Sequence, residues 1–415
     1  MSTSNPAATL ESVVESVDRD HIPASQVHLE PAAAKRVAIA SWGVGVLGVV
    51  ACLVGVSGNP VAAFGSYHAA YMLYLALALG SLAFVLIHHV TGARWGVVLR
   101  RIAEAVASTL PLFVILFVPV LLGKNHLFEW MRPEVAASDK LIQEKAGYLN
   151  VPFFLVRAVF YFAVWTFFST RLAKLSQAQD GGNGEAYLAK MKRLTAPAIL
   201  LFALSITFAA FDWLMSVSPH WFSTMFGVYY FAGAFQAGLA LLILVTFAIR
   251  RTGLLQGIVS VEHMDDMGKF LFAFTVFYAY IAFCQYFLIW YANIPEETFW
   301  YLERWEGGWA GTALTMVFTT FVIPFLILLG REPKRRAGPL IAASLIVLIG
   351  RAIEMYWMVM PSLKVGPTMP WTTLAALVGI GGLFLGTIAW RLGKAPLIPI
   401  GDPYLRASLG HENHV

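Results

Sequence analysis

The chain has 415 residues, of which 58% are hydrophobic and only 13% charged, and its mean hydropathy is +0.68. A soluble domain of this length needs far more charge to cover its surface, so the composition predicts a membrane protein. The net charge of +5 is small, and no basic patch with interleaved aromatic residues indicates nucleic-acid binding. Two cysteines in separate apolar runs, Cys52 and Cys284, are too few for an iron–sulfur centre and are typical of buried packing residues.

Ten apolar runs follow a polar, acidic N-terminal segment. Residues 1–36 contain no apolar core of a signal peptide, and we expect a mobile tail there. Each run is close to the ~20 residues that cross the hydrocarbon core as a helix, and the runs are too uniformly apolar for barrel strands. We therefore expect an all-α integral membrane protein with ten transmembrane helices and a C-terminal tail at 393–415. The runs cover residues 37–56, 67–87, 101–122, 151–170, 196–216, 225–248, 267–291, 309–329, 339–360 and 372–392.

Positive charge is distributed unevenly between the two sides of this topology. Most of the 29 Lys and Arg residues lie in the N-terminal segment, in the loops after even-numbered runs and in the C-terminal tail. The positive-inside rule then predicts that both termini are cytoplasmic. The outer side carries two long loops, 123–150 and 292–308, which are long enough to contact a partner. The second loop is acidic and aromatic, which is equally typical of an interfacial belt with solvated carboxylates.

An aspartate stands near the outer end of the fifth run. Asp212 is followed by Trp213, and His220 comes after Pro219, just beyond the expected helix. An ionisable residue at a helix centre in lipid costs about 2.5–3.5 kcal/mol, so such a residue needs a partner or a task. Asp212 either caps and hydrates the helix end, or accepts a proton that His220 passes outward.

The ninth run contains an arginine and a glutamate on one helical face. Arg351 and Glu354 are three residues apart and can form an ion pair that fixes helix packing, or can belong to a polar pocket or proton path. Asp212 precedes Pro219 by seven residues, and Glu354 precedes Pro361 by the same interval. This weak internal echo suggests two related four-helix units, formed by runs two to five and runs six to nine.

Further polar candidates lie on both sides of the expected membrane. For each alone, a hydrogen-bonded residue between helices is the simpler interpretation, but together they place acids and histidines mainly on the outer side. The candidates are His68 and Arg157 toward the outer side, Gln236 and Gln285 within runs six and seven, and Glu104, His263, Asp265 and Asp266 on the inner side, where Glu104, Asp265 and Asp266 are candidates for proton entry.

Redox and nucleotide motifs are missing from the sequence. All ten histidines lie at run ends, in loops or in the termini, so none has the mid-span position that a transmembrane b-type haem needs. No CxxCH motif, cysteine cluster or nucleotide-binding motif is present. We expect no metal site and no covalently bound cofactor, so any electron carriers must belong to other subunits.

Three stretches are specific enough to suggest a family: FDWLMSVSPHWFSTMFGVYYFAGAF, MGKFLFAFTVFYAYIAFCQYFLIWYANIPEETFWY and the tail GDPYLRASLGHENHV. Over nearly its whole length the chain resembles the NrfD-like (polysulfide-reductase membrane-subunit-like) proteins of alternative complex III, a bacterial quinol:cytochrome c (or other electron acceptor) oxidoreductase. The resemblance implies two four-helix bundles with peripheral first and last helices, in the bacterial inner (cytoplasmic) membrane. It also implies an iron–sulfur subunit, multihaem c-type cytochrome subunits and a sister NrfD-like subunit as partners.

For function, the resemblance implies quinol oxidation near the outer face and proton paths through both NrfD-like subunits. It marks Asp212 and His220 as candidate proton-handling residues, whereas Arg351 and Glu354 rest on the residue argument alone. We expect a subunit that binds quinone or menaquinone, passes protons and carries no redox centre itself. The alternatives are a scaffolding or proton-conducting subunit without quinol turnover, and a secondary transporter. The transporter is disfavoured because Pro119 and Pro324 accompany no central charge cluster.

Overall fold

The computed structural model describes residues 22–413, and within them helices are the only regular secondary structure, as expected. Ten helices of the described part are long and apolar enough to cross a membrane, which confirms the ten predicted spans. The spans are α3 (Pro31–Val54), α4 (Pro60–Thr91), α5 to α7 (Val97–Ala107, Leu110–Leu116 and Val118–Leu122), α11 (Val151–Ala178), α12 (Gly184–Trp213), α13 (Phe226–Arg250), α14 (Val261–Ala292), α16 with η6 and α17 (Ala310–Val317, Phe318–Val322 and Ile323–Leu328), α19 (Ala337–Val359) and α20 (Trp371–Leu392).

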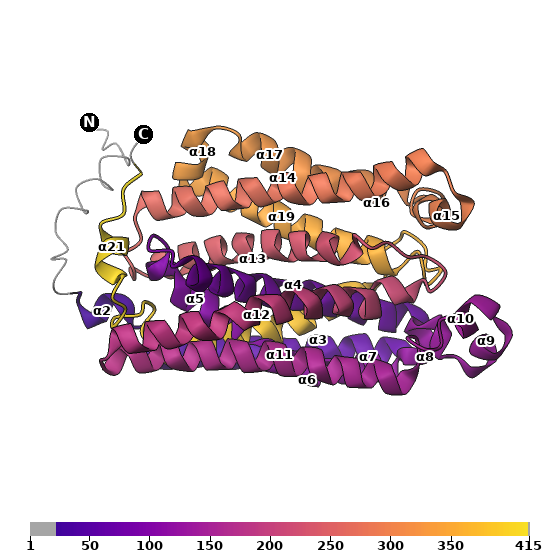
Figure 1. Ribbon diagram of the computed structural model, residues 1–415, viewed down its shortest axis with the longest axis horizontal. Helices are drawn as coiled ribbons and strands as arrows, with labels where there is room; N and C mark the ends of the chain where they lie inside the picture. Colours follow the sequence, from indigo (N-terminus) through magenta and orange to yellow (C-terminus); the bar gives the residue numbers. More distant parts are fainter. Residues whose placement is uncertain (1–21, 414–415) are drawn as a thin grey trace.

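Short helices occupy the two ends of the molecule (Figure 1). We call the end with α2 (Ala24–Val27), α18 (Arg331–Arg335) and α21 (Leu405–Leu409) the terminal end. The opposite end is the loop end, which carries α8 (Lys124–Leu127), α9 (Pro133–Ser138), α10 (Lys140–Glu144) and α15 (Pro295–Glu303).

Several helices begin earlier than the apolar runs because polar side chains cap them. Asn59 accepts a hydrogen bond from the backbone N–H of Ala62 at 3.0 Å, so α4 starts at Pro60 rather than at residue 67. Ser260 and His263 form a reciprocal capping box at the start of α14. Hydropathy alone does not detect these polar first turns.

Two spans are interrupted next to prolines. The third span is divided into α5, α6 and α7, and Pro111 and Pro119, near the starts of α6 and α7, each lack a backbone N–H for the helical ladder. In the eighth span a π-helical turn, η6, precedes Pro324. The backbone carbonyl of Thr320 in η6 accepts a hydrogen bond from the Gln236 side chain of α13.

The spans form two four-helix bundles with a peripheral pair. α4, α5–α7, α11 and α12 make the first bundle, and α13, α14, α16–α17 and α19 make the second. Helices α4 and α13 pack against each other where the bundles meet, and α3 packs along α20 at the side of the molecule. This is the predicted architecture.

Glycines allow the close approach between helices. A Cβ atom at Gly80 of α4 would lie 2.0 Å from the backbone oxygen of Ala234 on α13. On the peripheral pair, a Cβ at Gly48 would lie 2.6 Å from the Cα of Gly379. Small residues at such contacts replace the hydrophobic driving force that is missing between helices in lipid.

Replacing Gly80 with alanine is expected to destabilise the protein by about 1–3 kcal/mol, because the new methyl group must push apart two backbones. The midpoint of thermal unfolding in detergent measures the effect. Gly43→Ala is the control, because nothing lies within 4 Å of a Cβ atom at that position. An equal midpoint for both variants would show that the α4–α13 contact adapts without cost.

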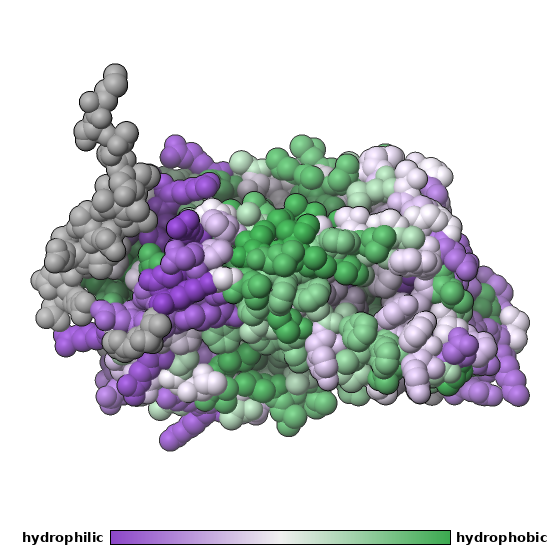
Figure 2. Space-filling view, turned by 90° about the horizontal axis from the view of Figure 1, so that it is seen from above, coloured by the Kyte–Doolittle hydropathy of each residue, from purple (hydrophilic) through white to green (hydrophobic). Residues whose placement is uncertain are grey.

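The surface matches a membrane environment. Figure 2 shows a band of hydrophobic residues across the middle of the molecule, with hydrophilic residues gathered toward both ends. Exposed side chains in the middle of the spans include Leu47, Val159 and Phe283. Such a band would be costly in water, so the chain is a multi-pass membrane protein.

The predicted N-terminal tail is packed where the structure describes it. Val27 is fully buried, and its carbonyl accepts a hydrogen bond from the backbone N–H of Leu397 at 2.7 Å. The first span then begins at Pro31, ahead of the predicted residue 37. The prediction of a mobile tail at 1–36 is therefore not met at 22–36, and residues 1–21 lie outside the described part.

The C-terminal segment also folds onto the bundles. Asp402 lies 2.7 Å from the guanidinium of Arg100. The backbone oxygen of Ser408 lies 3.0 Å from His263 Nε2. The tail predicted at 393–415 is thus a packed covering of the terminal end as far as residue 413.

Candidate functional site

The second bundle holds a buried ion pair on α19. Arg351 and Glu354 are only 1% and 0% exposed, and their side chains form a direct contact, as their spacing indicates. A buried pair of this kind must recover the cost of removing both charges from water. The surrounding groups therefore decide what the pair can do.

Two tyrosines from neighbouring helices complete the cluster. Tyr278 of α14 donates a hydrogen bond to Glu354 Oε1 at 2.7 Å, and Tyr229 of α13 donates to the same oxygen. The Arg351 guanidinium lies over the Tyr278 ring, 4.8 Å from its centroid. Gly233 makes room for the arginine, since a Cβ atom there would lie 2.0 Å from its Nη2.

A cleft of about 870 Å³ begins at these tyrosines and extends toward the loop end. Tyr229 and Tyr278 form part of its inner wall, while α14, α15, α16, η6 and the end of α19 supply the rest. At its margin Phe283 and Trp290 of α14 are 61% and 60% exposed. These side chains stand where lipid would surround the helices, so the cleft offers an apolar ligand a lateral approach to the Glu354 cluster.

Polar groups also line the loop end of the cleft. Gln285 donates to the Tyr301 hydroxyl at 3.1 Å and accepts from Ser223 at 2.9 Å. Arg304 donates to the carbonyls of Trp300 at 2.9 Å and Met358 at 2.7 Å. The cleft thus has hydrogen-bonding groups at both ends and aromatic walls between them.

Arg304 is buried without a carboxylate in direct contact in the described part of the chain. Its guanidinium stacks on the Trp300 ring at 3.5 Å, and burial lowers its pKa to about 9. A guanidinium satisfied mainly by carbonyl groups leaves a favourable position for an additional acceptor atom. It is therefore the strongest hydrogen-bond donor bordering the cleft.

Separate polar groups lie between the Glu354 cluster and the terminal end. Gln236 donates to Thr275 Oγ1 at 3.0 Å and to the Thr320 carbonyl at 2.9 Å, and its own side-chain oxygen has no hydrogen-bond partner. Beyond it, the buried Asp265 lies 2.9 Å from Lys269. These groups place Gln236 between the Glu354 cluster and the predicted inner-side acids.

Those inner-side acids contact Lys269 of their own helix and residues of the C-terminal segment. Asp266 lies 2.9 Å from Lys269 and 2.7 Å from His411 of the C-terminal segment. The predicted Asp265 and Asp266 are therefore adjacent but differently exposed, because Asp265 is fully buried. Both acids contact the C-terminal segment, since Asn413 donates to Asp265 Oδ2 at 3.4 Å and to Asp266 Oδ1 at 3.0 Å.

The first bundle contains a second buried acid. Arg157 of α11 forms a bidentate contact with Asp212 of α12, with Nε–Oδ2 and Nη2–Oδ1 distances of 2.7 and 2.8 Å. Tyr161, one turn along α11, donates to Asp212 Oδ2 at 2.7 Å. Sequence analysis selected Arg157 and Asp212 separately, and the structure brings them together.

Asp212 and His220, the predicted proton-handling residues, are not in direct contact. His220 Nε2 lies 2.7 Å from Asp139 Oδ2, and the histidine side chain is 41% exposed while Asp212 is fully buried. After α12 ends, Lys145 donates to the Pro219 carbonyl at 2.7 Å and fixes the loop that turns His220 outward. Backbone N–H donation from Ile142, followed by the contact with His220, lowers the pKa of Asp139.

His68 contacts the same helix end from α4. Its Nε2 lies 2.5 Å from the Trp213 carbonyl, and its Nδ1 has no hydrogen-bond partner. Both residues are buried. His68 therefore ties α4 to the end of α12 rather than reaching Asp212 directly.

Asp212 and Glu354 have similar surroundings, as their equal distances in sequence from Pro219 and Pro361 suggested. Each acid contacts an arginine and accepts hydrogen bonds from tyrosine: Arg157 and Tyr161 for Asp212, and Arg351 with Tyr229 and Tyr278 for Glu354. Arg157 holds both oxygens of its acid, whereas Tyr229 and Tyr278 converge on a single oxygen of Glu354 and also line the cleft. Glu354 is therefore the acid that a cleft ligand can reach through a hydroxyl group.

Glu104 lies at the terminal end of the first bundle. Its Oε1 is 3.1 Å from Arg100 and its Oε2 is 3.7 Å from Arg101. Arg100 and Arg101 also pair with Asp402 and Asp180, at 2.7 and 2.8 Å. The structure therefore sets this predicted inner-side acid in a network that joins α5 to the C-terminal segment.

No known protein family matches this chain, and no curated protein is significantly similar to it. The geometry of the Glu354 cluster and the adjoining cleft therefore carries the functional argument.

Proposed function

We propose that this chain is an integral membrane subunit of a quinol:electron acceptor oxidoreductase of the alternative complex III kind, and that it binds quinone or menaquinone in the second bundle. The observation that carries the proposal is the cleft of about 870 Å³ whose inner wall presents Tyr229 and Tyr278, both bonded to Glu354. Its size is within the range of about 300–1,000 Å³ for small-molecule sites. The apolar walls suit the ring and isoprenoid tail of a quinone.

The chemistry to be served is QH2 → Q + 2H⁺ + 2e⁻. A quinol oxygen placed against Tyr278 or Tyr229 can pass its proton through the phenol to Glu354, which acts as the base and releases the first proton before it accepts the second. Arg351 compensates the charge of the carboxylate while it awaits a proton. Both electrons leave to an iron–sulfur centre of a partner subunit.

The distribution of Lys and Arg supports an orientation with the terminal end in the cytoplasm of a bacterium and the loop end outside. The cleft then opens in the outer half of the inner membrane. The iron–sulfur subunit and the multihaem c-type cytochrome subunits would contact the loop end, where α9, α10 and α15 form a surface. A sister NrfD-like subunit would lie beside the chain in the membrane.

Proton conduction without quinol turnover is the second candidate function. Buried polar side chains along α11 favour proton conduction. Arg157, Tyr161 and Trp165 follow one another at intervals of four residues, and Trp165 donates a hydrogen bond to Ser205 at 2.8 Å. Together with Gln236 in the second bundle, they offer partial routes toward Glu104 and Asp265. Under this alternative the cleft would hold lipid and the sister subunit would bind the quinol.

A photoreactive quinone analogue separates the two functions. In the purified complex, we expect the analogue to label peptides from α14 and α15 of this chain, because these helices form most of the cleft. Excess natural quinone should suppress the label. Labelling confined to the sister subunit would contradict the quinone-binding proposal and leave the proton conduit as the remaining candidate.

A further inference from the structure

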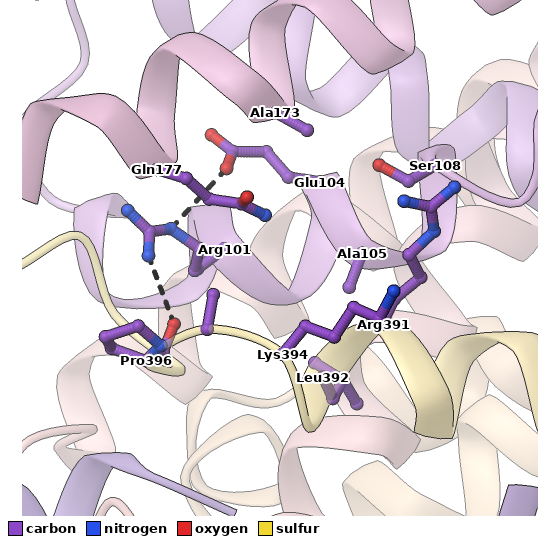
Figure 3. Close-up of a pocket in the computed structure, with 11 residues that line it drawn as sticks. Arg101, Glu104, Ala105, Ser108, Ala173, Gln177, Arg391, Leu392, Lys394 and Pro396 are labelled. Carbon is purple, nitrogen blue, oxygen red and sulfur yellow. Dashed lines mark hydrogen bonds and ion pairs between the residues drawn. The ribbon is translucent and has the colours of Figure 1, made fainter.

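A small pocket opens at the terminal end, between α5, α11 and the end of α20 (Figure 3). Its volume is about 60 Å³, and a cavity needs only about 10–15 Å³ to hold one water molecule. Ala105, Ser108 and Ala173 form its small-residue floor. The pocket therefore has room for a compact polar group such as a phosphate.

Two cations enter this pocket without an acidic partner. Figure 3 shows Arg391 and Lys394 reaching from the end of α20 toward α5. Among the described residues no carboxylate forms an ion pair with either side chain, and Arg391 Nε is buried with no hydrogen-bond partner. A buried guanidinium N–H without an acceptor is costly, so the site favours an anion that supplies one.

The other charged groups at the pocket form a network of two arginines and three carboxylates, in which Glu104 Oε2 has no hydrogen-bond partner. Glu104 contacts Arg100 and Arg101, and Arg101 also holds Asp180 and the Pro396 carbonyl. These contacts bind the acid to its own arginines. Arg391 and Lys394 take no part in this network, and with them four cations face three carboxylates, so the site keeps a net positive charge.

Tryptophans place the pocket at the depth of lipid headgroups. Lys394 Nζ lies 3.3 Å from the centroid of the Trp390 ring, and Arg391 lies 5.0 Å from it. Trp42 of α3 packs beside Trp390, with ring centroids 6.3 Å apart. Tryptophan is enriched at membrane–water interfaces, and basic pockets between membrane helices bind anionic headgroups.

We propose that this pocket binds the phosphate of an anionic phospholipid from the leaflet at the terminal end. Arg391 would hold the phosphate oxygens with its planar fork, and Lys394 would cover them from the solvent side. The bound lipid would link α20 to α5 and α11, which supply the other walls of the pocket.

The test compares lipid binding to the full-length chain in detergent by native mass spectrometry. Phosphatidylglycerol should bind well above phosphatidylcholine, and the double variant Arg391→Gln/Lys394→Gln should weaken phosphatidylglycerol binding by about tenfold or more. Arg171→Gln/Lys174→Gln is the matched control, because it removes two exposed cations from α11 outside the pocket. The control should change binding by less than about twofold.

Three results would overturn the proposal. The pocket variant could bind phosphatidylglycerol as well as the wild-type chain, or both double variants could lose affinity equally. Inorganic phosphate could also displace the lipid at equal concentration, which would identify a free anion as the ligand. Lys394→Glu guards against misfolding: the residue is exposed and makes no ion pair in the described part of the chain, so the variant should fold normally and still weaken lipid binding.

Discussion

Replacing Glu354 with glutamine in the intact complex is expected to lower quinol turnover by about 10²–10⁴-fold, the usual loss when a general base is removed. Glutamine has nearly the same shape and can still accept a hydrogen bond from Tyr278, but it cannot take up the quinol proton. The rate at saturating quinol should therefore fall more than the Michaelis constant changes. Steady-state quinol oxidation measures both quantities.

The substitution also leaves Arg351 buried without its counter-charge, and breaking such a pair costs about 3–5 kcal/mol. A loss of folded protein would therefore lower the measured quinol turnover even if Glu354 had no catalytic role. The double variant Arg351→Met/Glu354→Gln removes both charges and should restore much of the stability while remaining inactive. Labelling by the quinone analogue would show that its cleft is still formed.

Glu332→Gln supplies the matched control, because it removes a carboxylate that is 71% exposed on α18, at the terminal end of the second bundle and away from the cleft. Its turnover should equal that of the unmodified complex. Wild-type turnover in the folded double variant, with an unchanged H⁺/e⁻ ratio between about pH 6 and 8, would exclude Glu354 as the base.

Hydropathy predicted the ten spans because lipid leaves the backbone no alternative to helices. The Arg351–Glu354 contact was also predictable, since residues three apart share a helical face. The Arg157–Asp212 pair was not, because its members lie on different helices and no local pattern links them. Pairing between spans depends on helix rotation and order within the bundle.

The decisive parts of the second site carried no sequence signal. Tyr229 and Tyr278 stand in apolar runs where tyrosine is typical of packing, and only the folded bundle turns both hydroxyls onto Glu354. The position of His220 was not predicted either. Its nearness to Asp212 in the sequence suggested contact, but the turn after Trp213 carries it to Asp139.

Arg157→Met is expected to destabilise the protein by about 3–5 kcal/mol, because it leaves the fully buried Asp212 without its bidentate partner. The free energy of unfolding in mixed detergent micelles measures the loss. Arg157→Met/Asp212→Leu removes both charges and should recover most of it. An equally unstable double variant would show that the contact is not the main source of the cost.

The activity of that double variant decides between the two interpretations of Asp212. Arg157 holds both carboxylate oxygens and Tyr161 donates to one of them as well, so both oxygens of Asp212 are already engaged. We therefore expect the folded double variant, and Asp212→Asn, to retain quinol turnover and the H⁺/e⁻ ratio. A fall in either quantity at unchanged stability would instead make Asp212 a proton carrier whose arginine releases it during the cycle. Because Glu354→Gln removes only the base at the cleft, the contrast between the two acids locates the proton chemistry in one bundle.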